Sequence, residues 1–338
     1  MSANNPIRLG LVGTGIFARD AYLPALQSLG TTFEITAVYS RHLENAEAIT
    51  AKLTHAANAY DDLDALLDDD HVEAVALLLP IHVMPDAIEQ ALAAGKHVIS
   101  EKPAAPDVAT GRKLLDLYHQ HHADQVWMVA ENWRYDPALS HAVEMVRSQE
   151  VGAPLICHWP QYIDVSPDNK YYQTEWRRSG AFPGGFLLDG GVHHVAGLRL
   201  ILGEIASVSA VTTQMRPDLP PADTLNAALE FDSGLTGTYS VTYAHGAPWP
   251  SALYVVCERG ALRVQPGEVE ITAEDGVCRV ERANYVGVER ELAAFATAIR
   301  EGTSHDNTPE AGLQDVAVIE AMLRSAETGQ RIAPERFV

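Results

Sequence analysis

Residues 7–18 read IRLGLVGTGIFA, an apolar run that leads directly into a glycine turn. The run at 7–12 is typical of a buried parallel strand, and a helical pattern follows the turn. In a GxGxxA loop after a strand, the first glycine makes the tight turn and the second lets a pyrophosphate approach the backbone at a helix N-terminus. The stretch therefore predicts a dinucleotide-binding loop, the alternative being a purely structural turn. The predicted cofactor-binding residues here are Gly13, Thr14, Gly15, Ile16 and Phe17.

Strand-like and helix-like segments alternate through the first third of the chain. Strands are predicted at 34–39, 74–79, 97–100 and 125–130, and helices at 43–53, 87–94 and 107–119. This order predicts a doubly wound parallel sheet, a Rossmann domain at residues 1–128. Further on, the runs at 227–231, 237–243 and 253–257 predict an antiparallel sheet, followed by helices at 288–300 and 309–327. We therefore expect an α/β protein whose second domain spans residues 129–338.

Composition excludes several classes of protein. The 338 residues include 45 Asp and Glu but only 24 Lys and Arg, so the net charge of −21 repels phosphate backbones and anionic lipid. We therefore expect no nucleic-acid or membrane partner. No signal-peptide pattern or membrane-length apolar stretch is present in the sequence. Cys157, Cys257 and Cys278 lack metal-ligand spacing and are expected to be buried thiols in a reducing compartment, which predicts a cytoplasmic protein.

The end of the second predicted strand indicates which cofactor is preferred. An NAD enzyme usually has an acidic residue there to bind the ribose 2′-hydroxyl, but residues 38–41 read VYSR and the first acid is Glu44. Arg41 is able to form two hydrogen bonds to a 2′-phosphate, with the Ser40 hydroxyl beside it. We therefore expect NADP rather than NAD. The alternative is a solvated arginine at the start of a helix.

A lysine follows one of the predicted parallel strands. Residues 100–103 read SEKP, at the carboxyl end of a strand, where doubly wound folds place their chemistry. The ammonium group of Lys102 is able to bind a substrate oxygen, with Glu101 and a cis Pro103 fixing its direction. A Glu-Lys pair before a proline is also common on protein surfaces, so the motif alone leaves both interpretations open.

A second motif lies at 184–194, which reads GGFLLDGGVHH. If 187–202 is a helix, Asp189 and His193 are four residues apart and project from one face. His193 is suited to give or take the proton that accompanies hydride transfer, and Asp189 to orient the substrate or the imidazole. Glycines inside this helix indicate close approach of a ligand or another backbone. His194 points elsewhere, either to substrate or into the core.

Two other clusters are candidates for a substrate-binding or a metal-binding site. The aromatic side chains of Tyr171, Tyr172 and Trp176 are able to form a wall for a sugar ring, or to pack under a long loop. The segment 119–124 contains three histidines and an aspartate at the polar end of a predicted helix. Because a solvated helix terminus explains these residues, we expect no metal site.

With these motifs in view, the chain resembles a known family. The GTGIFA loop at 13–18, the EKP at 101–103 and the DGGVH at 189–193 are similar to the ordered motifs of the Gfo/Idh/MocA oxidoreductases, named for glucose-fructose oxidoreductase, inositol dehydrogenase and rhizopine catabolism. The resemblance spans nearly the whole chain. It implies an N-terminal Rossmann domain and a C-terminal α/β domain whose open sheet is often a dimer face. The catalytic group that it implies is Lys102, Asp189 and His193.

The resemblance also places residues outside this group. Leu79 and Pro80 stand where the family often has Thr-Pro, which is expected to alter side-chain contacts to the cofactor and keep the backbone contacts. With the residues above, the further expected cofactor contacts are Glu101, Lys102 and Asn132. The expected substrate contacts are Arg134, Tyr172, Trp176, Arg177 and His194.

What the family does sets the functional expectation. Its members act on sugars, inositols, anhydrosugars and dihydrodiols, and some relatives are nucleotide-binding sensors without catalysis. Ala196 replaces the acid often found three residues after the motif histidine, which weakens any transfer of substrate identity from the inositol or glucose enzymes. We expect hydride transfer at a carbinol or carbonyl carbon of a small sugar, cyclic polyol or dihydrodiol, by a homodimer or homotetramer. The proton-transfer residues favour an enzyme over a sensor.

Overall fold

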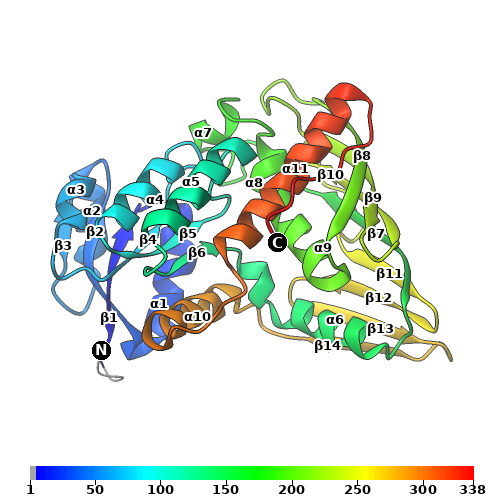
Figure 1. Ribbon diagram of the computed structural model, residues 1–338, viewed down its shortest axis with the longest axis horizontal. Coiled ribbons are helices and arrows are strands. Elements are labelled where there is room, and N and C mark those ends of the chain that lie inside the picture. Colours follow the sequence, from blue (N-terminus) through cyan, green and yellow to red (C-terminus); the bar gives the residue numbers. More distant parts are fainter. Residues whose placement is uncertain (1–4) are drawn as a thin grey trace. The chain divides into compact units, whose positions relative to one another are not determined.

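The computed structural model describes residues 5–338, which divide into two compact units (Figure 1). The first unit contains residues 5–105 together with Ala109–Asn132 and Val288–Leu313. The second unit contains Pro106–Val108, Trp133–Gly287 and Gln314–Val338. The expected division at 1–128 and 129–338 differs mainly in the segment Val288–Leu313, which packs with the first unit. The α/β class predicted from the sequence is confirmed in both units.

The first unit is built on a six-stranded sheet in which every neighbouring pair is parallel. Its strands, in order across the sheet, are β3 (Asn58–Tyr60), β2 (Phe33–Tyr39), β1 (Ile7–Val12), β4 (Ala74–Leu77), β5 (His97–Glu101) and β6 (Trp127–Ala130). This is the strand order of the Rossmann fold, with its switch point between β1 and β4. All four residues of β4 are buried, as expected for a strand covered on both faces.

Helices connect these strands, as the alternating pattern predicted. They are the π-helical turn η1 (Ala18–Tyr22), α1 (Leu23–Ser28), the short η2 (Gly30–Thr32), α2 (Leu43–Thr50), α3 (Leu63–Leu67), α4 (Met84–Ala93) and α5 (Val108–His121). The backbone is helical from Ile16, directly after the glycine turn, through η1 into α1. The strand, turn and helix predicted from residues 7–18 are therefore present.

A helix from the end of the chain completes the first unit. The helix α10 (Gly287–Glu301) lies beside α1 (Figure 1) and belongs to the same apolar core. Leu292 and Phe295 are fully buried, and the Phe295 ring stacks on Phe33 with centroids 6.5 Å apart. Leu292 and Phe295 are three residues apart and lie on the same apolar face of α10. Burial of this face explains why the helix packs with the first unit, although the sequence analysis assigned it to the second domain.

The second unit is built on an eight-stranded sheet. Its strands, in order, are β14 (Cys278–Arg282), β13 (Glu268–Ala273), β12 (Gly260–Gln265), β11 (Leu253–Cys257), β7 (Pro154–Tyr162), β10 (Thr236–Thr242), β9 (Thr224–Phe231) and β8 (Ile205–Thr213). The sheet is antiparallel except where β7 runs parallel to β10. The sequence did not predict β7, because Pro154 and Pro160 weaken a strand pattern.

Helices cover one face of this sheet. The long helices α6 (Pro137–Ser148), α9 (Gly191–Leu202) and α11 (Pro309–Thr328) form this layer. The short helices η3 (Asn132–Tyr135), α7 (Glu175–Arg178) and α8 (Phe186–Asp189) lie in the connecting segments. Along β7 the covered side chains Cys157 and Trp159 alternate with the exposed side chains Ile156 and His158. The other face, to which Ile156 belongs, carries no helix of its own unit in Figure 1.

The helix predicted at 187–202 is two helices, α8 and α9, separated by Gly190. Gly190 keeps right-handed helical angles, so the interruption is slight. A Cβ atom at Gly190 would lie 2.1 Å from the Tyr243 hydroxyl, and one at Gly191 would lie 2.9 Å from Cδ1 of Ile319. The two glycines therefore make room for these side chains, where we had expected a ligand or another backbone.

Two expectations about exposure have different outcomes. Cys157 and Cys257 are buried, as expected, but the expectation was wrong for Cys278, which is exposed on the edge strand β14. Burial raises the pKa of the Cys157 thiol to about 12.

Across residues 5–338, every helix is too short or too polar to cross a membrane.

Three glutamates meet in the interior of the first unit. Glu291 on α10 is fully buried, and its carboxylate accepts a hydrogen bond from Asn307 at 3.4 Å. Burial, together with the negative charges of Glu101 and Glu131, raises the pKa of Glu291 well above its usual range. The folded protein therefore keeps the Glu291 proton to a higher pH than the unfolded chain does.

We predict that Glu291→Gln stabilises the protein increasingly as pH rises from 5 to 8. In the wild type, the Glu291 carboxyl group binds more protons in the folded state than in the unfolded state. The free energy of unfolding therefore falls as pH rises between the pKa of the unfolded state, about 4.3, and the raised pKa of the folded state. The slope approaches about 1.4 kcal/mol per pH unit for one whole proton, and glutamine removes it. Thermal unfolding of both proteins at several pH values measures the difference. The control is Glu301→Gln, an exposed residue on the same helix, and a pH-independent difference for Glu291→Gln would contradict the prediction.

Candidate functional site

The predicted cofactor residues of the first unit lie at one edge of its parallel sheet. Because parallel strands end at a common edge, the residues that follow β1, β2, β4, β5 and β6 gather there. In that strand order they are the 13–17 loop, Ser40 with Arg41, Leu79 with Pro80, Glu101 with Lys102, and Asn132. The structure thus brings together the residues that sequence analysis assigned to the cofactor, at the edge where doubly wound sheets bind ligands.

The glycine loop has the backbone that a dinucleotide requires. Gly13 adopts a φ of +107°, and a Cβ atom there would lie 2.5 Å from the carbonyl oxygen of Leu78, so only glycine fits. Its N–H donates to the Tyr39 carbonyl at 3.0 Å. Gly15 is exposed at the start of the helix, and a Cβ there would meet no atom of residues 5–338 within 4 Å. The loop therefore offers open backbone at a helix N-terminus, which fits a pyrophosphate.

The end of β2 carries Ser40 and Arg41, the two residues predicted to bind the ribose and its 2′-phosphate. Ser40 is buried, and its hydroxyl accepts a hydrogen bond from the Thr14 hydroxyl at 3.3 Å, which ties the two loops together. Arg41 is exposed, immediately before α2. The first acid, Glu44, is already inside that helix. The end of β2 thus presents a cation and no carboxylate.

Lys102 directly follows β5. Lys102 is half-buried, and its bond to the buried Pro103 is cis, as expected. The preceding Glu101 is half-buried, and its charge is one of the two that raise the pKa of Glu291. Lys102 therefore stands at the carboxyl end of β5, at the edge of the parallel sheet.

In the second unit, Asp189 is held by an arginine. The Arg177 Nε donates to Oδ2 of Asp189 at 2.7 Å, and its Nη1 donates to the Thr174 hydroxyl at 3.0 Å. The guanidinium also lies over the Trp176 ring, 4.1 Å from the centroid. Three residues predicted for catalysis or substrate contact, Asp189, Trp176 and Arg177, are therefore one cluster. The Tyr243 hydroxyl is close by, and burial with the Asp189 charge raises the pKa of Tyr243.

The two adjacent histidines differ in exposure. His193 is half-buried, and its ring stacks on Trp133. His194 is buried, and its Nδ1 shares a hydrogen bond with the Tyr239 hydroxyl at 2.7 Å. The geometry of His194 is that of the core alternative, whereas His193 is less buried. Sequence analysis missed Trp133, although it stands between two residues that were singled out, Asn132 and Arg134.

Arg134 and Tyr172 are engaged by the protein itself. Arg134 is buried and pairs with Asp315, which also pairs with Arg199. The Tyr172 hydroxyl donates to Asp218 at 2.9 Å. Neither contact was foreseeable, because Arg134 and Asp315 are 181 residues apart in sequence. The substrate contacts expected of Arg134 and Tyr172 remain predictions.

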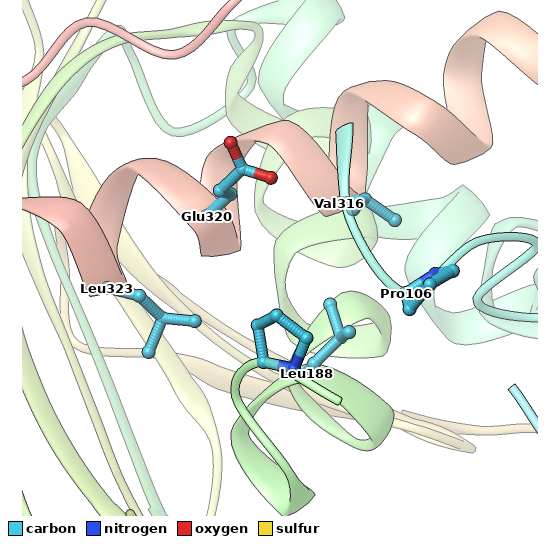
Figure 2. A pocket seen from close by; sticks show the side chains of 6 residues that line it. Pro106, Leu188, Val316, Glu320 and Leu323 are labelled. Carbon is cyan, nitrogen blue, oxygen red and sulfur yellow. The ribbon is translucent and has the colours of Figure 1, made fainter. Parts of the chain in front are cut away.

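A small hollow lies behind α8 (Figure 2). Its walls are formed by Leu188, the residue before Asp189, and by side chains of α11 and of residues 106 and 183. The one charged side chain in its lining, Glu320, accepts a hydrogen bond from the Val108 N–H at 2.8 Å. The hollow is therefore a packing defect beneath the Asp189 helix, and its apolar walls offer little to a polar substrate.

Comparison with known proteins now identifies the class. Residues 7–130 match the family model described as oxidoreductase family, NAD-binding Rossmann fold, and residues 143–333 match the C-terminal alpha/beta domain of the same family. The chain belongs to the Gfo/Idh/MocA family and is an NAD(P)-dependent oxidoreductase, which confirms the resemblance read from its motifs and favours an enzyme over a sensor.

Individual relatives agree with this assignment. Dehydrogenase FPY6 of Fusarium mangiferae is 34% identical and covers 95% of this chain and 96% of its own. D-xylose 1-dehydrogenase (NADP(+)) 2 of Haloferax volcanii is 29% identical, over 96% of this chain and 98% of that relative. The crystal structure of an oxidoreductase from Thermotoga maritima, 36% identical, superposes with a TM-score of 0.91 over 97% of this chain and 98% of that chain.

Proposed function

We propose that this oxidoreductase prefers NADP and acts on a CH–OH or carbonyl carbon of a sugar, cyclic polyol or dihydrodiol. The observation that carries the proposal is the placement of two polar groups: Lys102 directly follows β5 at the sheet edge, and His193 follows four residues after Asp189, which Arg177 holds. Substrate class is supported by the relative from Haloferax volcanii named for D-xylose and NADP(+).

Each group has a defined task in this proposal. A bound nicotinamide supplies or accepts a hydride at its C4. Lys102 binds the substrate oxygen with its ammonium group, which stabilises negative charge on that oxygen. His193 gives or takes the accompanying proton, and Asp189, fixed by Arg177, orients the substrate or the imidazole. Ser40 and Arg41 bind the adenosine ribose and its 2′-phosphate.

The first test is a survey of substrates. The purified protein is mixed with aldoses, inositols, anhydrosugars and aromatic dihydrodiols, with NADP and NAD in parallel, and the absorbance of the reduced nicotinamide is followed. We expect turnover with at least one of these classes and a higher kcat/KM with NADP. Tight NADPH binding with no turnover on any member of the survey would contradict the proposed substrate class.

We predict that Lys102→Ala lowers kcat by about 100-fold or more, because an oxyanion-stabilising charge is lost in the transition state. NADPH affinity should change by less than about threefold, since the backbone of the glycine loop is untouched. Steady-state kinetics and fluorescence titration measure the two quantities. Lys113→Ala, an exposed lysine on α5, serves as the control. Near wild-type turnover in Lys102→Ala would rule out the proposed role.

We predict that Arg41→Ala weakens NADPH binding by about tenfold to 100-fold and leaves NADH binding nearly unchanged. The lost hydrogen bonds go to a charged phosphate, and such bonds contribute about 1.5–3 kcal/mol each. Parallel titrations with both nucleotides provide the ratio, and Arg290→Ala, an exposed arginine on α10, is the control. Equal dissociation constants for the two nucleotides in the wild type would show that Arg41 is a solvated helix-start residue.

We also propose that the chain self-associates through the helix-free face of the second sheet. Ile156 and Val256 are exposed and directly opposite each other on β7 and β11, and Val211 and Val280 are exposed on the same face. Val256→Glu should lower the molar mass measured by light scattering, because it places a charge in a contact that excludes water. Val277→Glu, on the exposed hairpin turn, is the control. A wild type that is monomeric at every concentration would refute the proposal.

A further inference from the structure

The imidazole of His193 rests on the face of an indole. The ring centroids of His193 and Trp133 are 5.3 Å apart, and the ring planes are within 15° of parallel. Both side chains are half-buried, so the contact is partly shielded from water. A parallel stack restricts tilting of the smaller ring, because tilting would replace face contact with a gap or a clash.

Trp133 is itself supported on its other sides. Its ring stacks on Trp159 at 6.1 Å between centroids and meets the His194 ring edge to face at 5.4 Å. Trp159 lies in the core, 2% exposed, and reaches this position because α9 has a glycine there. A Cβ at Gly197 would lie 2.7 Å from the Trp159 ring. The support behind Trp133 is therefore rigid.

The support continues to the sheet. His194 stacks obliquely on Tyr239 of β10 and shares a 2.7 Å hydrogen bond with its hydroxyl, while Tyr239 is fully buried. On either side of Trp133 along the chain, the buried Arg134 pairs with Asp315, and the Asp136 carboxylate accepts the N–H groups that begin α6. The indole is thus held through its rings and through its backbone.

We propose that Trp133 is a positioning residue for His193, holding the imidazole in the orientation that proton transfer to the substrate oxygen requires. The proposal rests on the proposed function and deepens it. A ring that carries a proton must present one nitrogen to the reacting oxygen at hydrogen-bond distance, and small misplacements are costly to the rate.

The test compares Trp133→Leu, which removes the aromatic face, with Trp133→Phe, which keeps one. Trp249→Leu is the matched control, because Trp249 is 65% exposed and packs only on Tyr162 among the described aromatic rings. Thermal unfolding and NADPH titration establish that each variant is folded. In Trp133→Leu we expect kcat to fall by about tenfold to 100-fold with KM and NADPH affinity within about twofold, and Trp133→Phe to recover most of the loss.

A second readout does not depend on turnover. With the 14 histidines isotopically labelled, the His193 ring signals are identified by their loss in His193→Asn. Because an aromatic face shifts the signals of protons stacked on it, we expect the His193 ring signals to move in Trp133→Leu and to move much less in Trp133→Phe. Unchanged His193 signals in Trp133→Leu would overturn the stacking, and a kcat within twofold of the wild type would overturn the positioning role.

The outcomes separate this inference from the proposed function. If His193→Asn abolishes turnover while Trp133→Leu does not, the inference fails and the proposed function stands. If His193→Asn leaves turnover intact, the proposed role of His193 fails, and the inference falls with it. An equal loss of kcat in Trp249→Leu would likewise overturn the inference, because the effect would then not be specific to the stacked ring.

Discussion

The close passage of Gly13 beneath the Leu78 carbonyl is the constraint on which the first unit depends. At this point β1 ends next to β4, and the chain must turn sharply to begin its helix while the neighbouring strand turns the other way. A side chain would force the two strand ends apart, and with them the loops that carry Ser40 and Lys102. The same turn leaves backbone N–H groups open at a helix N-terminus, so a steric requirement of the fold and a binding requirement of the cofactor are met by one residue.

The second unit solves a different problem, which is to hold polar groups steady inside an apolar interior. Asp189 is fixed by Arg177, and the imidazole of His193 by a stack of rings that begins at a buried tyrosine. Buried Arg134 and Arg199 share Asp315, so their charges are compensated. Asp189 and His193, the two groups proposed to take part in chemistry, are therefore each in contact with a neighbouring side chain that limits their movement.

The sequence predicted those parts of the molecule in which local pattern and structure coincide. The strand, turn and helix at 7–18, the alternation that follows, and the motif residues at the strand ends were all within reach of periodicity and spacing. The sequence did not predict β7, because its prolines weaken the strand pattern, and it did not predict that α10 packs with the first unit. Asp315, Trp133 and Glu291 were missed for one physical reason: their importance comes from partners distant in sequence, and no local pattern records such a meeting.

The return of α10 also affects how the protein is made. Leu292 and Phe295 fill the core of a unit whose first strand begins at Ile7, so the two parts of that core leave the ribosome almost a whole chain apart. Until the segment Val288–Leu313 has emerged, the nascent sheet has an uncovered apolar surface where α10 will lie. The nucleotide-binding unit is therefore first in sequence and among the last parts to be completed, and a fragment that ends before α10 presents that surface to chaperones or to other chains.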